Sequence, residues 1–154
     1  MKRMSLVILL VIALGLPAAL SADTGAGVVL GDPTGVSLLF EERIAVAAAW
    51  DVSHHLHLHG DLWLFARRLV DPVDWYMGVG ARLLVFTEGS TSGPSWAEGD
   101  DRDQGVGIGA RVPFGLQWYP MKQLEVFGEL VPVLSLFPAT GFDMDFGIGL
   151  RYHF

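Results

Sequence analysis

Cysteine is absent from the 154 residues of this chain. Its absence excludes a disulfide framework, a thiolate metal site and a catalytic thiol. It equally excludes a lipid anchor attached to an N-terminal cysteine. Any stability or chemistry of this protein must therefore come from other side chains.

Basic residues are few. The chain holds 10 lysines and arginines against 17 aspartates and glutamates. Two of the basic residues, Lys2 and Arg3, belong to a segment that we expect to be removed. The remaining chain then carries eight basic and 17 acidic residues, a formal charge of −9. Such an acidic balance argues against nucleic acid as a partner.

The motifs of common enzyme and cofactor sites are missing as well. No serine stands in a G-x-S-x-G elbow, and neither a phosphate-binding loop nor the EF-hand ligand spacing occurs. Gly105 to Gly109 alternates glycine with apolar residues, but no helix is expected after it, so it is not a dinucleotide fingerprint. We assign no catalytic residue, no cofactor and no metal, and an enzyme remains the minor alternative because fold is a poor guide to function.

Residues 1–22 have the features of a cleaved secretory signal. A positive start is followed by the apolar run Met4 to Leu16 and then by small residues between Ala18 and Ala22. Cleavage is expected after Ser21 or Ala22. The alternative is a membrane-anchoring helix, but an apolar stretch ending at Leu20 is shorter than the ~20 residues that a span requires. The mature domain is thus expected to cover residues 23–154.

The mature chain shows period-two alternation, which is typical of β-strands, and no convincing helical period. From Met144 to Phe154, large apolar residues alternate with Asp145, two glycines, Arg151 and a histidine. Segments 55–66, 75–86 and 104–119 repeat this design. Less regular segments at 24–31, 35–41, 43–51 and 124–136 bring the expected number of strands to eight.

The length of the apolar faces separates two kinds of barrel. In a soluble sandwich or a lipocalin-like barrel the apolar face points inward and the charges lie in water. The faces here run through six or seven apolar positions, longer than a usual soluble strand of ~5–6 residues and suited to tilted membrane strands of ~9–11. The sequence therefore predicts an all-β fold, an eight-stranded antiparallel up-and-down transmembrane β-barrel.

Aromatic residues are expected to gather at the two rims of such a barrel. With strands alternating up and down, one rim receives Phe40, Trp75, Trp118, Tyr119, Tyr152 and Phe154, and the other receives Trp50, Phe137 and Phe142. Two such girdles lie at headgroup level in membrane barrels. The 17-residue segment from Thr87 to Asp103 follows the fifth strand and so falls opposite both termini, where long external loops belong. The shorter linker at 67–74 is expected at the periplasmic rim.

Several segments together resemble a known group of proteins. They are Gly27-Val-Val-Leu-Gly-Asp-Pro-Thr-Gly35, His55-Leu-His-Leu-His-Gly-Asp61, Gly109-Ala-Arg-Val-Pro-Phe-Gly115, Phe127-Gly-Glu-Leu-Val-Pro-Val133 and Gly147-Ile-Gly-Leu-Arg-Tyr-His-Phe154. The mature chain is similar to a poorly characterised group of small bacterial outer-membrane barrels with the architecture of the OmpA transmembrane domain. This resemblance implies a location in the outer membrane of a Gram-negative bacterium and a fold, and it implies no known activity.

The resemblance also bears on partners. The last strand, with Leu150, Tyr152 and Phe154, is similar to the signal that the barrel-assembly machinery reads during biogenesis. We expect outer-membrane lipid to surround a monomer, and we expect no peptidoglycan-binding domain after the barrel. An extracellular partner is not identified.

Inward-facing charges are the first candidate site. An eight-stranded barrel has an interior just wide enough for side chains, so these charges must pair. On the expected phases the lumenal charge network consists of Asp61, Arg82, Arg111, Glu129, Asp145 and Arg151. We interpret it as a salt-bridged plug in a barrel with a structural or surface-interaction role. The alternative is a narrow low-conductance channel resembling a porin.

Two weaker candidates remain. His55, His57 and His59 share a strand face with Asp61, which is a donor set that zinc accepts, but no second strand supplies further ligands. We therefore favour a lumenal hydrogen-bonding role for these imidazoles. The acidic segment 87–103 is expected to be a solvated surface loop, and its Trp96 is the candidate contact for an extracellular partner because exposed tryptophan is enriched in binding hot spots.

Overall fold

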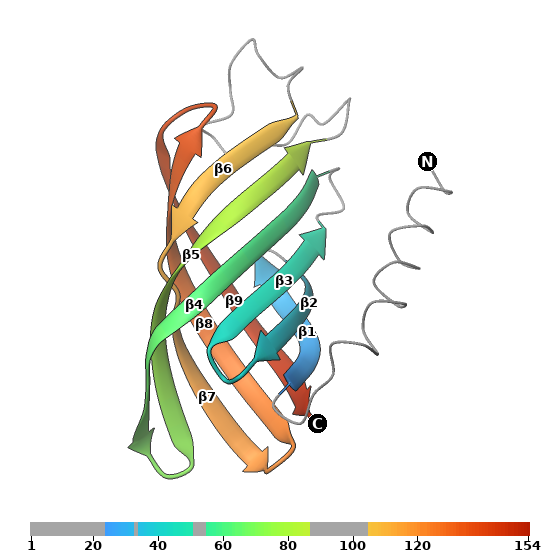
Figure 1. Cartoon of the computed structure of the whole chain (residues 1–154), viewed down its shortest axis with the longest axis vertical. Helices are drawn as coiled ribbons and strands as arrows, with labels where there is room; N and C mark the ends of the chain where they lie inside the picture. The colour runs from blue at the N-terminus through green and yellow to red at the C-terminus, as the bar shows by residue number, and fades with distance from the viewer. Residues whose placement is uncertain (1–23, 33, 51–54, 87–104) are drawn as a thin grey trace, which may run out of the picture.

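The computed structural model describes residues 24–32, 34–50, 55–86 and 105–154. Within these residues the chain forms nine strand segments and no helix (Figure 1). The segments are β1 (Thr24–Asp32), β2 (Gly35–Phe40), β3 (Ile44–Trp50), β4 (His55–Val70), β5 (Val73–Phe86), β6 (Val106–Arg111), β7 (Phe114–Met121), β8 (Leu124–Phe137) and β9 (Gly141–His153). The described part of the chain accordingly holds no helix that is long and apolar enough to cross a membrane. The expected signal peptide at 1–22 lies outside the described residues.

The strands close into a ring. From β1 to β5, each strand pairs in antiparallel fashion with the next one along the chain. Segments β6 and β7 both pair with β5 and with β8, and β8 pairs with β9. The last strand then pairs with the first, in a register that runs from Gly25 opposite His153 to Asp32 opposite Phe146. Because both sides of every strand find a partner, the sheet has no open edge along most of its length. The predicted eight-stranded antiparallel barrel is confirmed.

Segments β6 and β7 together make one strand of the barrel. Both pair with β5 on one side and β8 on the other. The break falls at Val112 and Pro113, where the amide of Gly78 donates to the Pro113 carbonyl over 3.0 Å and the Val112 amide donates to Pro132 over 3.0 Å. Proline has no amide hydrogen for the ladder. The continuous strand predicted over 104–119 is therefore interrupted at its proline.

The β4–β5 hairpin is longer than the sequence indicates. Segment 67–74 was expected to be a linker, but β4 continues to Val70 and β5 begins at Val73, so Asp71 and Pro72 alone make the turn. A register shift between Trp63 and Phe65 is the cause. The bulge interrupts the period-two alternation that marks the strand in the sequence.

Burial alternates around the ring in the predicted phases. In β9, the outward-facing Phe146 and Ile148 are 58 % and 66 % exposed. Arg151, in the inward-facing phase of the same strand, is only 2 % exposed. The same alternation is seen in β6, with buried Gly107, Gly109 and Arg111. Apolar side chains thus cover the outside of the barrel, while glycine and charged side chains fill its inside.

Exposed aromatic residues lie at both ends of the barrel. Trp118, Tyr152 and Phe154 are about half exposed at the end that carries the C-terminus. Phe137 and Phe142 are exposed at the opposite end, where β8 and β9 meet. The strands β5 and β6 also approach this opposite end at Phe86 and Val106, on either side of segment 87–104 (Figure 1).

Candidate functional site

The inner face of the barrel carries all six side chains of the predicted lumenal charge network. They come from five strands: Asp61 from β4, Arg82 from β5, Arg111 from β6, Glu129 from β8, and Asp145 and Arg151 from β9. The exposed fraction of each side chain is 12 % or less. Charges buried this deeply are strongly destabilising unless they are paired, and the structure arranges them in three clusters around the three arginines.

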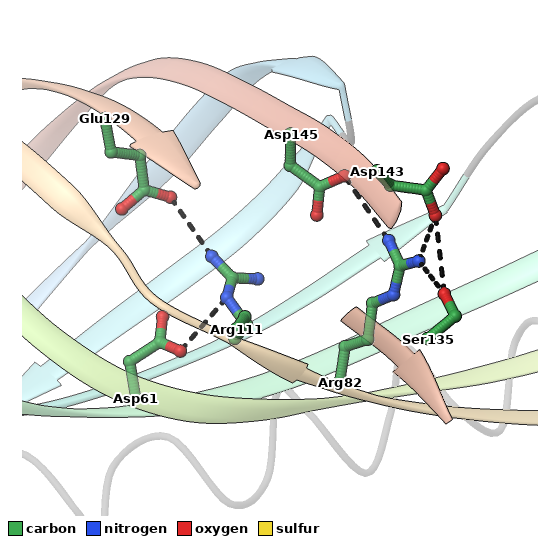
Figure 2. Close-up of polar contacts among 7 residues, drawn as sticks. All are labelled: Asp61, Arg82, Arg111, Glu129, Ser135, Asp143 and Asp145. Atoms are coloured by element: carbon green, nitrogen blue, oxygen red, sulfur yellow. Dashed lines mark hydrogen bonds and ion pairs between the residues drawn. The ribbon is translucent and has the colours of Figure 1, made fainter. Parts of the chain in front are cut away.

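The central cluster is built on Arg111. Its Nε atom lies 3.0 Å from Asp61 Oδ1, and its Nη2 atom lies 3.7 Å from Glu129 Oε1 (Figure 2). The hydroxyl of Tyr76 donates a hydrogen bond of 2.9 Å to the other Glu129 oxygen. His59 Nε2 stands 4.0 Å from Asp61. This cluster ties β4, β5, β6 and β8 together across the lumen.

The second cluster surrounds Arg82 nearer the end that carries segment 87–104. Figure 2 shows the guanidinium between two carboxylates of β9 and a hydroxyl of β8. Its Nη1 atom lies 3.4 Å from Asp145 Oδ1, and its Nη2 atom donates to Ser135 Oγ over 2.8 Å and contacts Asp143 Oδ2. The strand β5 is thereby linked through the lumen to β8 and β9.

The third cluster occupies the end that carries the C-terminus. Arg151 donates to Glu125 over 2.7 Å and to the hydroxyl of Ser37 over 3.0 and 3.1 Å. Glu125 is fully buried, and it also accepts from Gln117 at 2.9 Å and contacts His153 Nε2 at 2.7 Å. Every carboxylate oxygen of this buried glutamate therefore has a partner, as burial of a charge requires.

Aromatic rings support the third cluster from inside the barrel. The guanidinium carbon of Arg151 lies 3.7 Å from the centre of the Phe127 ring and 5.7 Å from that of Trp63. Trp63 in turn stacks on Tyr76 with ring centres 3.9 Å apart. A cation over an aromatic face is attracted by the ring quadrupole. The rings thus connect the third cluster with the central one.

Glycines opposite these rings make the room that the rings occupy. A Cβ atom added at Gly115 would overlap the Tyr76 ring, and one added at Gly149 would overlap the Phe127 ring. At Gly80 it would meet the Asp61 carboxylate and the backbone of β4. The glycine-rich inner face is therefore the complement of the large lumenal side chains.

The lumen beside the central cluster is almost filled. A cavity lined by His59, Arg111, Glu129 and Asp145 measures only about 10 Å³, which is the space of about one water molecule. Arg111 and its partners cross the barrel at this level. Such close packing of charged side chains is typical of a plug.

The histidines of β4 do not form a metal site in the described part of the chain. His57 is buried and His59 half-buried on the lumenal face, and their rings meet edge to face with centres 5.3 Å apart. Among the described residues no three ligating side chains of His, Asp or Glu converge as a metal requires. Trp96 and segment 87–103 lie outside the described residues.

Sequence reasoning missed several members of the network. Glu125 and Ser135 lie on β8, whose alternation is less regular than that of the neighbouring strands, and Asp143 lies one position before the expected start of the last strand. The inward phase of Glu129 extends to Glu125 and Ser135 in steps of two, and that of Asp145 extends to Asp143. The signal was therefore present, but it required the strand boundaries to be known first.

Comparison with known proteins bears on the fold. No family model and no curated protein matches the chain. Among solved structures, the chain is similar to the N-terminal β-barrel domain of OprF from Pseudomonas aeruginosa, with a TM-score of 0.52 and 15 % sequence identity over 85 % of this chain and 95 % of that one. It also matches Ail, the attachment invasion locus protein of Yersinia pestis, with a TM-score of 0.39 and 15 % identity over 85 % of this chain and 93 % of that one. The likeness to the OprF domain supports the small OmpA-like barrel architecture that the sequence resembles.

Proposed function

We propose that the mature chain is a non-catalytic protein of the bacterial outer membrane, in which it resides after removal of residues 1–22. The supporting observation is the inverted distribution of polarity. Exposed Leu30, Phe146 and Ile148 lie outside the barrel, while Arg111, Glu125 and Arg151 are at most 2 % exposed inside it. An apolar outer belt of this extent is costly in water and is stabilised by surrounding lipid.

The plug interpretation of the lumen follows from its contacts. Each lumenal arginine contacts a strand that is not its neighbour in the sequence: Arg82 contacts β9, Arg111 contacts β4, and Arg151 contacts β2. The cavity beside Arg111 has space for about one water molecule. We infer a structural or surface-interaction role for a monomer whose lumen is sealed. The barrel-assembly machinery would insert it, and an extracellular partner would meet it at segment 87–103, where Trp96 remains the candidate contact.

A catalytic role is not favoured by the described side chains. The two buried serines, Ser37 and Ser135, each contact an arginine and not a histidine base. A serine nucleophile needs a base within hydrogen-bond reach to be activated. The lumenal hydroxyls are therefore assigned to the ion-pair network.

Electrophoresis and planar-bilayer recording test this function. We expect the mature protein, refolded in detergent, to migrate differently before and after boiling, as a closed barrel does, and to show a β-rich spectrum. A protein that is helical, or soluble without detergent, would refute the membrane barrel.

In planar bilayers we expect no steady conductance from the wild type. The low-conductance channel is the alternative function. It would be established by a conducting wild type whose ion selectivity changes in the variants Arg111→Ala and Glu129→Ala.

A further inference from the structure

The wall of the barrel is short at β2 and β3 (Figure 1). Both ends of β2 are turns. At one end Gly31 and Thr34 exchange hydrogen bonds of 2.9 and 3.2 Å. At the other end the Arg43 amide donates to the Phe40 carbonyl over 2.9 Å. Only the six residues Gly35–Phe40 lie between these turns as strand, whereas β4, β5, β8 and β9 contain 13 to 16 residues each.

The length of a strand sets the height of the apolar surface that it offers to lipid. At a rise of ~3.4 Å per residue and a tilt of ~40°, the six residues of β2 cover about 15 Å of height. The apolar band of an outer-membrane barrel is about 25 Å tall, and a strand that crosses it needs about 9–11 residues. The β2 wall is therefore too short for a bilayer of ordinary thickness.

Neither turn of β2 fits a hydrocarbon layer. Glu41, Glu42 and Arg43 form the β2–β3 turn, and all three are charged and exposed. Thr34 is polar and exposed at the β1–β2 turn. Irregular backbone exposed to lipid does not occur within hydrocarbon, because no water is there to bond its amide and carbonyl groups. Both turns therefore lie at or beyond the edges of the lipid core.

The open edge of β4 sets the same boundary. Pairing of β4 with β3 ends at Leu62 opposite Ile44. One further amide bond joins Trp63 to the Arg43 carbonyl. From there to Val70, β4 pairs with β5 alone among the described strands. An open sheet edge is excluded from hydrocarbon for the same reason as a turn, so the lipid core beside β3 ends no further than the β2–β3 turn.

Aromatic anchors fix the height of the barrel on its other walls. Trp118 and Tyr152 are 47 % and 50 % exposed at the end that carries the C-terminus, and Phe137 and Phe142 are 53 % and 67 % exposed at the opposite end. The described side chains of β2 and β3 include no exposed aromatic residue. Rings of this kind settle at headgroup level. Because the long strands are anchored at both interfaces, the barrel cannot shift along the membrane normal to accommodate its short wall.

We propose that the wall formed by β2 and β3 is a lipid-binding surface that thins the membrane beside it, so that lipids with short or compressed acyl chains collect along Leu38 and Val46. The inference rests on the proposed membrane location. A hydrophobic surface shorter than the bilayer is accommodated by thinning of the bilayer or by association with a second copy. Thinning is favoured because a second barrel on this face would still leave the charged turn and the open β4 edge at hydrocarbon depth.

Site-directed spin labelling tests the proposal, and the absence of native cysteine makes each label unique. Thr34→Cys and Glu42→Cys place one nitroxide on each turn of β2 in vesicles of dioleoylphosphatidylcholine. Collisions with oxygen and with a water-soluble nickel complex report the depth of each label. The two positions are about 20 Å apart along the membrane normal, less than the ~30 Å core of an undisturbed bilayer. We expect both labels to be accessible to the nickel complex.

A matched pair of labels compares a short and a long wall at mid-height. Leu38→Cys lies in the middle of β2 and Ile148→Cys near the middle of β9, and both native side chains point outward. We expect nickel collisions at Leu38 to be at least about twice as frequent as at Ile148, because half of a ~15 Å wall is shallower than half of a ~25 Å band. This comparison does not depend on the turn variants.

A label on either turn that the nickel complex does not reach would overturn the proposal, as would equal nickel accessibility at Leu38 and Ile148. Strong spin–spin broadening of the Leu38 label between barrels would show that a second copy covers the wall, and it would overturn the proposal too. An Ile148 label in water would refute the membrane location itself. Each sample is also run unboiled on a gel, so that a failure of the barrel is distinguished from an absence of thinning.

Discussion

At the scale of single residues, the packing of the lumen depends on glycines that lie opposite large aromatic rings. Gly115 faces the Tyr76 ring, which cannot retreat because it stacks on Trp63 and donates to Glu129. We expect Gly115→Ala to destabilise the barrel by about 1–3 kcal/mol, the usual cost of overpacking. Urea unfolding of the refolded protein in lipid vesicles measures the difference.

The control for this substitution is Gly60→Ala. Gly60 lies on β4, and a Cβ atom added there has nothing within 4 Å. It carries the same change in backbone entropy without the overlap, so its free energy of unfolding should not fall. Equal destabilisation by both variants would show that the Tyr76 ring is not the cause.

The buried arginines give a second prediction at this scale. In Arg111→Met, Asp61 and Glu129 lose the cation that lies between them. Leaving charges buried without their partner costs about 3–5 kcal/mol, and the same unfolding measurement should show a loss of this size.

The triple variant Arg111→Met, Asp61→Asn, Glu129→Gln removes the whole set of charges. It should recover much of the stability, because neutral partners no longer face an uncompensated charge. A triple variant no more stable than Arg111→Met alone would contradict the assignment of an ion-paired plug.

At the scale of elements, the β2–β3 turn is built from unfavourable residues. Glu41 and Glu42 have φ angles of 50° and 54°, and the Arg43 amide donates to Phe40 over 2.9 Å. A two-residue hairpin turn with both φ angles positive favours Asn and Gly. We expect Glu41→Asn with Glu42→Gly to stabilise the barrel by about 2 kcal/mol, since the left-handed region costs residues other than Gly and Asn at least about 1 kcal/mol each.

Thermal or urea unfolding measures this gain. The control variant Glu41→Gln with Glu42→Gln removes the same two charges but keeps side chains for which the left-handed backbone conformation is unfavourable. If the control gains as much stability, charge repulsion and not backbone strain is the cause.

The strands themselves follow from the sequence wherever alternation is unbroken. The inward and outward faces of β5, β6 and β9 could be predicted because successive side chains of a strand point alternately to the apolar outer surface and to the lumen. The extension of β4 to Val70 could not, because it depends on register shifts that form when β4 and β5 meet. The break between β6 and β7 falls at Pro113, a residue without an amide hydrogen for the ladder, so the sequence did contain a signal for it.

The candidate site was predictable in its outline and not in its pairing. Phase alone placed Arg82, Arg111 and Arg151 inside, but which carboxylate each contacts depends on the stagger of strands around the ring. Arg82 of β5, for example, contacts Asp143 of β9 across the lumen. The partner Glu125 went unassigned since its strand lacks a regular alternation near its start.

At the scale of the whole molecule, the strand order predicts sidedness. The ends of β5 and β6 on either side of segment 87–104 lie opposite the end that carries Phe154 (Figure 1). If the C-terminal end lies in the periplasm, as in outer-membrane barrels, we expect the residues between these two ends to be on the outside of the cell. We expect a tag inserted at Gly93 to be stained on intact cells and protease to cut between Thr87 and Asp103.

A tag placed in the Asp71–Pro72 turn serves as the control, and it should be stained only after the outer membrane is broken. The reverse pattern, with the Gly93 tag hidden and the turn accessible, would invert the topology.

Closure of the ring has a consequence for how the molecule folds. The Phe154 amide donates to the Thr24 carbonyl over 3.1 Å, and β9 pairs along the whole of β1. The contacts that seal the barrel are thus those with the greatest separation along the chain, which gives a high contact order and slow folding. Until this seam forms, Arg151 cannot reach Ser37 on the far side of it. Pairing of β9 with β1 is therefore the step that converts an open, aggregation-prone sheet into a closed barrel.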